Sequence, residues 1–148
     1  MTKEKLSSLA EMAEVLEDGG YYVAMGEGFL AAKVAHRNHP PANALLTIDE
    51  IRKKLVISCR VARYGDVPAE RLPAFQAALL DANTRIDPFA FATITDQDDP
   101  DLDSPDEWIV VLIESMCISD LSTGELLTAM EDLTHALPTA DDIMAAIA

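Results

Sequence analysis

The sequence predicts an α+β fold, in which helices lie on one face or at the ends of an antiparallel sheet. Strand-like segments come in hairpin groups separated by helices, whereas a parallel sheet would need strands and helices in alternation. The chain has 148 residues, enough to bury roughly 68–70% of its unfolded surface without a disulfide or a metal. We therefore expect a single domain over residues 1–148, with the order α-β-β-β-α-β-β-α and a short C-terminal helix.

The first helix is expected over residues 6–17, where apolar residues recur at helical spacing. Ser8 and Glu11 have the spacing of a capping box, and Gly19-Gly20 provides a C-terminal stop. The apolar face that this helix turns toward the core consists of Leu6, Leu9, Met12, Ala13 and Leu16.

Strand-forming residues dominate the chain from residue 21 to residue 62. The turn Gly26-Glu27-Gly28 separates two of the strands, and the pair Pro40-Pro41 breaks the chain after them. The clearest strand carries strictly alternating apolar residues. The expected strands are residues 21–25, 29–36 and 54–62, with a short extra strand at 44–48.

A second helix is expected from Pro73 to about Asn83, since proline is tolerated in a first helical turn. Two further strands are expected at residues 89–95 and 107–117. The second of these is apolar on both faces, which is typical of a strand covered on both sides.

Ser122 and Glu125 mark the start of the third helix, again with capping-box spacing. We expect Pro138 to end this helix, which places His135 near its C-terminal end, where a cation is favourable. A short terminal helix is expected after Thr139.

The net charge of −15 comes from the second part of the chain. Residues 67–148 hold two basic and seventeen acidic residues, whereas residues 1–66 hold nine of each. The excess of negative charge in residues 67–148 repels phosphate groups, so nucleic acids and anionic membranes are poor partners for this part of the chain. A basic cluster has three open interpretations: a solvated surface, a counter-charge within the chain or on a second copy, and a nucleic-acid patch. It consists of Arg52, Lys53, Lys54, Arg60 and Arg63.

The acidic segment, residues 96–107, is the first candidate site, with seven acids in twelve positions. An EF-hand frame that starts at Asp99 fails, because Ser104 takes the glycine position and Val110 the final glutamate position. Three interpretations stay open: a solvated loop, another specific metal site, and a docking site for a basic partner. The candidate partner-binding residues are Asp98, Asp99, Asp101 and Asp103.

Motifs for catalysis are missing from the sequence. It contains no GxSxG, P-loop or HExxH motif, and Gly26-Glu27-Gly28 lacks the third glycine of a dinucleotide fingerprint. His36 and His39, three apart in a loop, are typical of a polar surface. We therefore predict that the protein is not an enzyme, and assign no catalytic residue, no cofactor and no metal ligand.

Three further residues stand inside apolar stretches. Cys59 and Cys117 have no CxxC partner, and we expect both to be buried and reduced. Glu114 interrupts an apolar run, so it either faces outward at the end of its strand or is a functional acid with a raised pKa.

Three stretches carry a resemblance to a known family: LSSLAEMAEVL with GGYYVAMGEG, LVISCRVARYGDVPAERLPAFQAALLDAN, and EWIVVLIESMCISDLSTGELLTAMEDL. In these the chain resembles the YjfI-like and YbjN-like bacterial proteins, which have the type III secretion chaperone-like fold. The acidic segment departs from the pattern, because a shorter hairpin is expected there. No catalytic residue carries over.

The resemblance implies a dimeric cytoplasmic protein that holds a segment of another protein. We therefore expect a non-enzymatic chaperone-like or adaptor protein, a homodimer, whose partner is a phage-shock-protein-A-like protein of a bacterial stress response. No apolar run reaches the ~18 residues of a membrane span, so no membrane insertion is expected. The alternative is a regulatory module, or a small-molecule or metal-dependent protein that uses the acidic segment.

Overall fold

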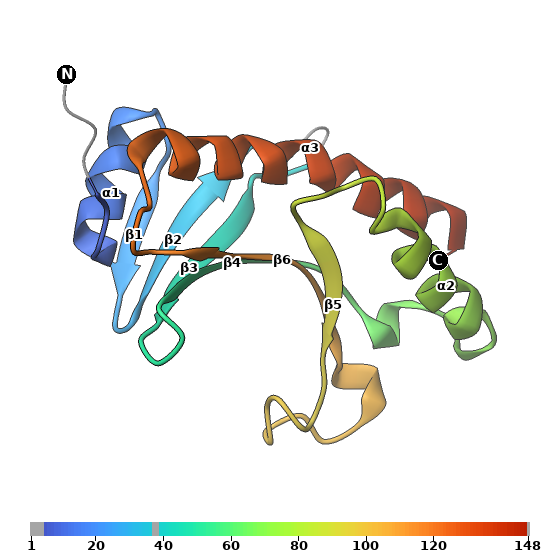
Figure 1. Ribbon diagram of the computed structural model, residues 1–148. Helices are drawn as coiled ribbons and strands as arrows, with labels where there is room; N and C mark the ends of the chain where they lie inside the picture. Colours follow the sequence, from blue (N-terminus) through green and yellow to red (C-terminus); the bar gives the residue numbers. More distant parts are fainter. Residues whose placement is uncertain (1–4, 37–38, 148) are drawn as a thin grey trace.

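The chain forms one six-stranded antiparallel sheet with its helices on one face, which confirms the predicted α+β class (Figure 1). The computed structural model describes residues 5–36 and 39–147. The strands lie in the order β1-β2-β3-β4-β6-β5, and every neighbouring pair is antiparallel. They are β1 (Val23–Gly26), β2 (Phe29–Val34), β3 (Ala42–Asp49), β4 (Lys54–Arg63), β5 (Ala90–Ile94) and β6 (Ile109–Cys117).

Four strands precede the second helix, where the sequence predicted three and a short extra one. The extra strand is β3, which pairs along its length with both β2 and β4. Its alternation of buried Ala44 and Leu46 with exposed Asn43 and Leu45 is the period of a half-covered strand. Residues 42–49 therefore form a full central strand.

The first helix, α1 (Leu9–Asp18), begins as predicted. The Ser8 hydroxyl accepts a hydrogen bond from the Glu11 N–H at 3.2 Å, and the Glu11 carboxylate accepts one from the Ser8 N–H at 3.2 Å. These two bonds satisfy free N–H groups of the first turn. The helix buries Met12, Ala13 and Leu16 against the sheet.

The prediction that Pro138 ends the last helix is wrong, because α3 runs without a break over Thr123–Ile147. Proline cannot donate the N–H that the carbonyl of Thr134 would accept, which costs ~3 kcal/mol in a helix interior. Burial offsets this cost, since Leu137 before the proline and Ala140 and Ile143 after it all lie in the core. The separate terminal helix is therefore part of α3, and the exposed His135 lies in its middle.

The remaining helix, α2 (Leu72–Ala82), packs beside the C-terminal part of α3 (Figure 1). Phe75 and Leu79 of α2 line a small cavity together with Ala140 and Ile143 of α3. The Arg71 guanidinium donates a hydrogen bond to the Ala146 carbonyl at 3.1 Å, which satisfies a free acceptor at the end of α3.

The core lies between the sheet and these helices. Leu30, Leu46 and Ile57 are register partners on β2, β3 and β4, and all three are fully buried. Strand β6 is buried on both faces from Ile109 to Leu112, as its sequence predicted, but only over this first part. Among the described residues, no helix is both long and apolar enough to cross a membrane.

Candidate functional site

One face of the sheet, called the helix-free face below, is not covered by a helix of the described residues. Alternation along each strand decides which side chains reach it: on β4, Leu55, Ile57 and Cys59 are buried under the helices, so Val56, Ser58 and Arg60 point to the other side. In Figure 1 α3 lies above the sheet, with α1 at one end of it and α2 at the other, and the acidic segment projects below.

Apolar side chains occupy the middle of the helix-free face. Leu45 and Phe29 are 39% and 37% exposed. Val56 and Ile113 are half-buried beside them. The face therefore presents apolar side chains on β2, β3, β4 and β6, with Ser58 between Leu45 and Ile113, and we call Phe29, Leu45, Val56 and Ile113 the apolar strip. Apolar groups gathered on an exposed face are typical of an interaction surface.

A groove of about 650 Å³ runs along this face at one end. Its floor includes Leu45, Ser58 and Val111, and its rim includes Arg60 and His36. The floor residues come from three neighbouring strands, since Ser58 pairs with Leu45 and Arg60 pairs with Val111. The groove is thus lined by the apolar side chains of Leu45 and Val111, the Ser58 hydroxyl, and the basic and imidazole groups of Arg60 and His36.

Basic side chains surround the apolar strip. Lys33, Lys54 and Arg60 point to the helix-free face from β2 and β4, and no described carboxylate lies within 4.0 Å of their charged nitrogens. Arg63 also reaches this side and pairs with Asp66 at 3.9 Å. The predicted basic cluster therefore belongs largely to one face, and Lys33, which is distant from it in sequence, joins it there.

The four aspartates predicted to bind a partner lie together in the β5–β6 connection. The Asp98 carboxylate accepts a hydrogen bond from the Thr95 N–H at 3.0 Å, and that of Asp99 accepts one from the Asp101 N–H at 3.1 Å. Asp103 donates its N–H to the Glu107 carboxylate at 2.9 Å. Three carboxylates of the acidic segment, those of Asp98, Asp99 and Glu107, accept hydrogen bonds from nearby backbone N–H groups, and among the described residues none of the segment belongs to a three-ligand cluster for a metal.

Glu114 does not face outward at the end of its strand. It pairs in register with the fully buried Ile57 and lies on the helix side of β6, where it lines a groove with Asp132 of α3. Burial raises the pKa of its carboxyl, and the carboxylates of Asp132 and Asp87 raise it further. Among the described residues, its Oε1 atom is buried without a hydrogen-bond partner.

The two cysteines differ in their exposure to solvent. Cys59 is buried as predicted, and burial raises the pKa of its thiol to about 11. Cys117 is exposed, so the prediction that it is buried is wrong. It is the last residue of β6 and pairs with Lys54 on the helix-free face, beyond the part of the strand that is covered twice. Both thiols are free.

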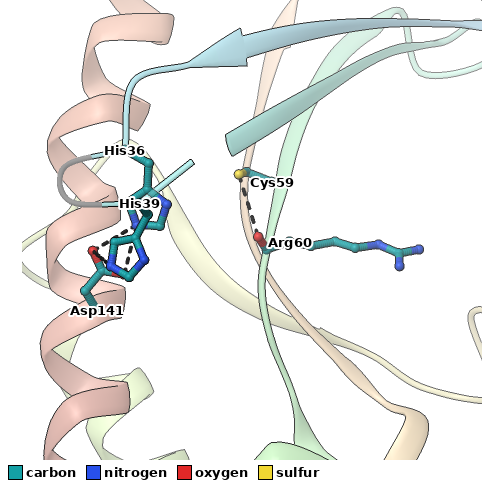
Figure 2. A network of polar contacts seen from close by, with 5 residues as sticks. All are labelled: His36, His39, Cys59, Arg60 and Asp141. Atoms are coloured by element: carbon teal, nitrogen blue, oxygen red, sulfur yellow. Dashed lines mark hydrogen bonds and ion pairs between the residues drawn. The ribbon is translucent and has the colours of Figure 1, made fainter. Parts of the chain in front are cut away.

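His36 and His39 do more than form a polar surface, because both approach Asp141 of α3 (Figure 2). Sequence analysis missed Asp141, which lies 105 residues from His36 and has no local motif around it. The only sequence signal was the pair of histidines beside two prolines, where the chain must turn.

Compared with models of known protein families and with curated proteins, the sequence matches neither. Over 90% of its length the chain is similar in structure to a chain in a solved structure described as the crystal structure of the ExsC-ExsE complex. It covers 97% of that chain with a TM-score of 0.47 and 15% sequence identity.

Proposed function

We propose that this chain is a non-enzymatic protein-binding protein of the chaperone-like or adaptor type, and that it acts as a homodimer through the helix-free face. The observation that carries the proposal is the apolar strip around Leu45 and Ile113. It is bordered by the charges of Lys54 and Arg60, which have no ion-pair partner among the described residues. Apolar surface in such a position is stabilised by covering it with another protein surface.

The charges around the helix-free face favour a second copy of the chain as its binding partner. At one end of β4 lies the basic hairpin, Arg52, Lys53 and Lys54, and at the other end Arg63 pairs with Ile109, where the acidic segment enters β6. The ten residues of β4 separate these ends by roughly 30 Å at ~3.3 Å per residue. The helix-free face therefore carries the basic hairpin at one end, and at the other end the acidic segment, with Arg60 close by.

A two-fold axis makes this face self-complementary. When two copies pack face to face with their strand directions reversed, each acidic segment lies against the basic hairpin of the other copy. The same operation places apolar strip on apolar strip at the centre. In this arrangement the negatively charged acidic segment contacts the basic hairpin of the other copy. The binding residues on the acidic side are Asp98, Asp99, Asp101 and Asp103.

The size of the face agrees with this role. Six strands spaced ~4.8 Å apart and averaging about seven residues give a face of roughly 600–700 Å². A stable interface of standard size buries about 800 Å² on each partner. The face, with the projecting acidic segment added, is therefore large enough for a specific dimer.

Light scattering coupled to size exclusion at micromolar concentration tests the proposal. We expect a mass twice the 16.1 kDa of one chain. Leu45→Asp should give monomers, because it buries a charge at the centre of the interface. Leu80→Asp is the matched control, since Leu80 is 72% exposed on α2, away from the helix-free face, and should leave the dimer intact.

A charge swap tests the orientation. Reversal of the basic hairpin by R52E, K53E and K54E should weaken the dimer, as should reversal of the acidic segment by D98K, D99K, D101K and D103K. The two sets combined should restore it. A wild-type monomer at tens of micromolar, or a Leu45→Asp dimer as stable as the Leu80→Asp dimer, would refute the homodimer.

The resemblance to the YjfI-like and YbjN-like proteins extends the proposal to a cytoplasmic role in a bacterial stress response. A phage-shock-protein-A-like protein is then the expected partner of the dimer. Co-elution of the two purified proteins tests this extension, with the Leu45→Asp variant run in parallel. If the two proteins elute separately, the proposed phage-shock-protein-A-like partner is refuted. This result leaves the homodimer untouched, because light scattering alone tests it.

A further inference from the structure

The histidine cluster, His36, His39 and Asp141, joins the β2–β3 connection to α3. The Nε2 atom of His36 lies 2.9 and 2.8 Å from the two carboxylate oxygens of Asp141, and that of His39 lies 3.7 Å from one of them. The two imidazole rings are stacked, with centroids 4.3 Å apart and planes inclined by 25°. Figure 2 shows both rings directed at the same carboxylate.

This geometry is close to that of a metal site. One ligand atom from each residue lies within 4.8 Å of the other two. Around a tetrahedral Zn²⁺ with bonds of ~2.0–2.1 Å, ligand atoms lie about 3.3 Å apart. The 3.7 Å distance from His39 to Asp141 is near this value, and the 2.8 Å distance from His36 has to widen by only about 0.5 Å.

We propose that the histidine cluster binds a divalent transition-metal ion of the Zn²⁺ class. Two imidazole nitrogens and one carboxylate oxygen are ligands that Zn²⁺ and its neighbours accept, whereas Ca²⁺ and Mg²⁺ require oxygen ligands. The single carboxylate offsets part of the charge of the ion, and the net charge of −15 on the chain favours a cation further.

The position of the cluster suits an exchangeable ion. The side chains of His36, Asp141 and His39 are 18%, 31% and 50% exposed, so the ligands are partly desolvated and an ion can still reach them. Three protein ligands leave one tetrahedral position open. Because both histidines line the groove on the helix-free face, a donor group held in that groove can reach the open position.

Metal binding would also cross-link the fold. His36 and Asp141 are 105 residues apart in sequence, and the ion would fix the connection between two strands to the C-terminal part of α3. An ion that binds the folded chain more tightly than the unfolded chain raises the melting temperature. The site therefore has a stability readout that is independent of any activity.

Calorimetric titration of the full-length chain with ZnCl₂, after dialysis against EDTA, tests the site. We expect one ion per chain and a dissociation constant at least about tenfold weaker in Asp141→Asn and in His39→Ala. The matched controls His135→Ala and Asp142→Asn change an exposed histidine and an exposed aspartate of the same helix and should bind as the wild type does.

Cobalt provides a second measurement, since Co²⁺ in a tetrahedral site with nitrogen and oxygen ligands absorbs visible light. The absorption should appear in the wild type and both controls and be lost in the two cluster variants. Far-UV circular dichroism verifies that each variant is folded, and the half-exposed His39 is the substitution that disturbs packing least. Absence of Zn²⁺ binding by the wild type, or unchanged binding by both cluster variants, would overturn the proposal.

Discussion

Replacement of Pro138 by alanine should stabilise the protein, because Pro138 lies inside a continuous helix. Alanine restores the N–H that the Thr134 carbonyl lacks and removes the clash of the proline ring with that turn, a gain of ~3 kcal/mol in helix interiors. Proline also restricts the unfolded chain, and losing this restriction costs about 0.4–1 kcal/mol. The net gain is about 2 kcal/mol, which raises the melting temperature by roughly 4–8 °C for a chain of this size.

Thermal unfolding followed by circular dichroism at 222 nm measures this change. Thr139→Ala is the matched control, since it alters the next position of α3 without restoring a backbone donor and should shift the melting temperature by less than ~2 °C. If Pro138→Ala leaves the melting temperature unchanged or lowers it, the two parts of α3 do not form one helix.

Three further predictions concern a carboxyl group, the thiols and the acidic segment. Burial raises the pKa of the Glu114 carboxyl above its unfolded value of 4.5, so the stability that the protonated carboxyl contributes is complete below pH 4.5 and is lost as pH rises through the higher folded-state pKa. Glu114→Gln should therefore raise the melting temperature by about 2–4 °C at pH 7 and by less at pH 4. A maleimide at pH 7 should label Cys117 rapidly and Cys59 only after unfolding, because the Cys59 thiol is buried with a pKa of about 11. Replacement of residues 97–103 by Asn-Gly should lower the melting temperature by less than ~4 °C, because the hydrogen bonds of that segment are local.

Each of these predictions has a contrary outcome. A melting-temperature difference for Glu114→Gln that does not vary between pH 4 and pH 7 would show that its carboxyl titrates alike in the folded and unfolded chain. Equal labelling of the two cysteines would contradict the burial of Cys59. A larger fall in melting temperature after shortening of the acidic segment would show that the segment stabilises the fold. The control for a loop substitution is Ile51→Ser, at the exposed tip of the β3–β4 hairpin.

Local signals in the sequence predicted most of the elements. The capping boxes at Ser8 and Ser122 both form, since their partners lie three residues along the chain and need no tertiary contact. The alternation of residues 54–62 predicted β4 within one residue at its C-terminal end. Strands and helices whose apolar residues recur at a regular spacing can therefore be predicted from sequence, because that spacing indicates which face is buried.

The errors arise where distant contacts decide the outcome. Pro138 is a local helix breaker, yet the packing of Ala140 and Ile143 against α2 keeps the helix continuous. Cys117 lies in an apolar stretch, but the double covering of β6 ends before it. The pairing of His36 with Asp141 depends on the course of α3 beyond Pro138, so the mistaken helix end also concealed the histidine cluster.

The continuity of α3 links both proposals. Because α3 extends past Pro138, it carries Asp141 to the β2–β3 connection, where His36 and His39 form one end of the groove. An ion at this cluster would hold the end of the groove in place, and a dimer on the helix-free face would cover the groove from the other side. Both sites include the groove that His36 and His39 line, but they depend on different interactions. The ion needs three ligands within one chain, whereas the dimer needs apolar contact and opposite charges between two chains. Asp141→Asn should therefore weaken metal binding at least about tenfold and leave the dimer mass unchanged, whereas Leu45→Asp should dissociate the dimer and leave metal binding unchanged.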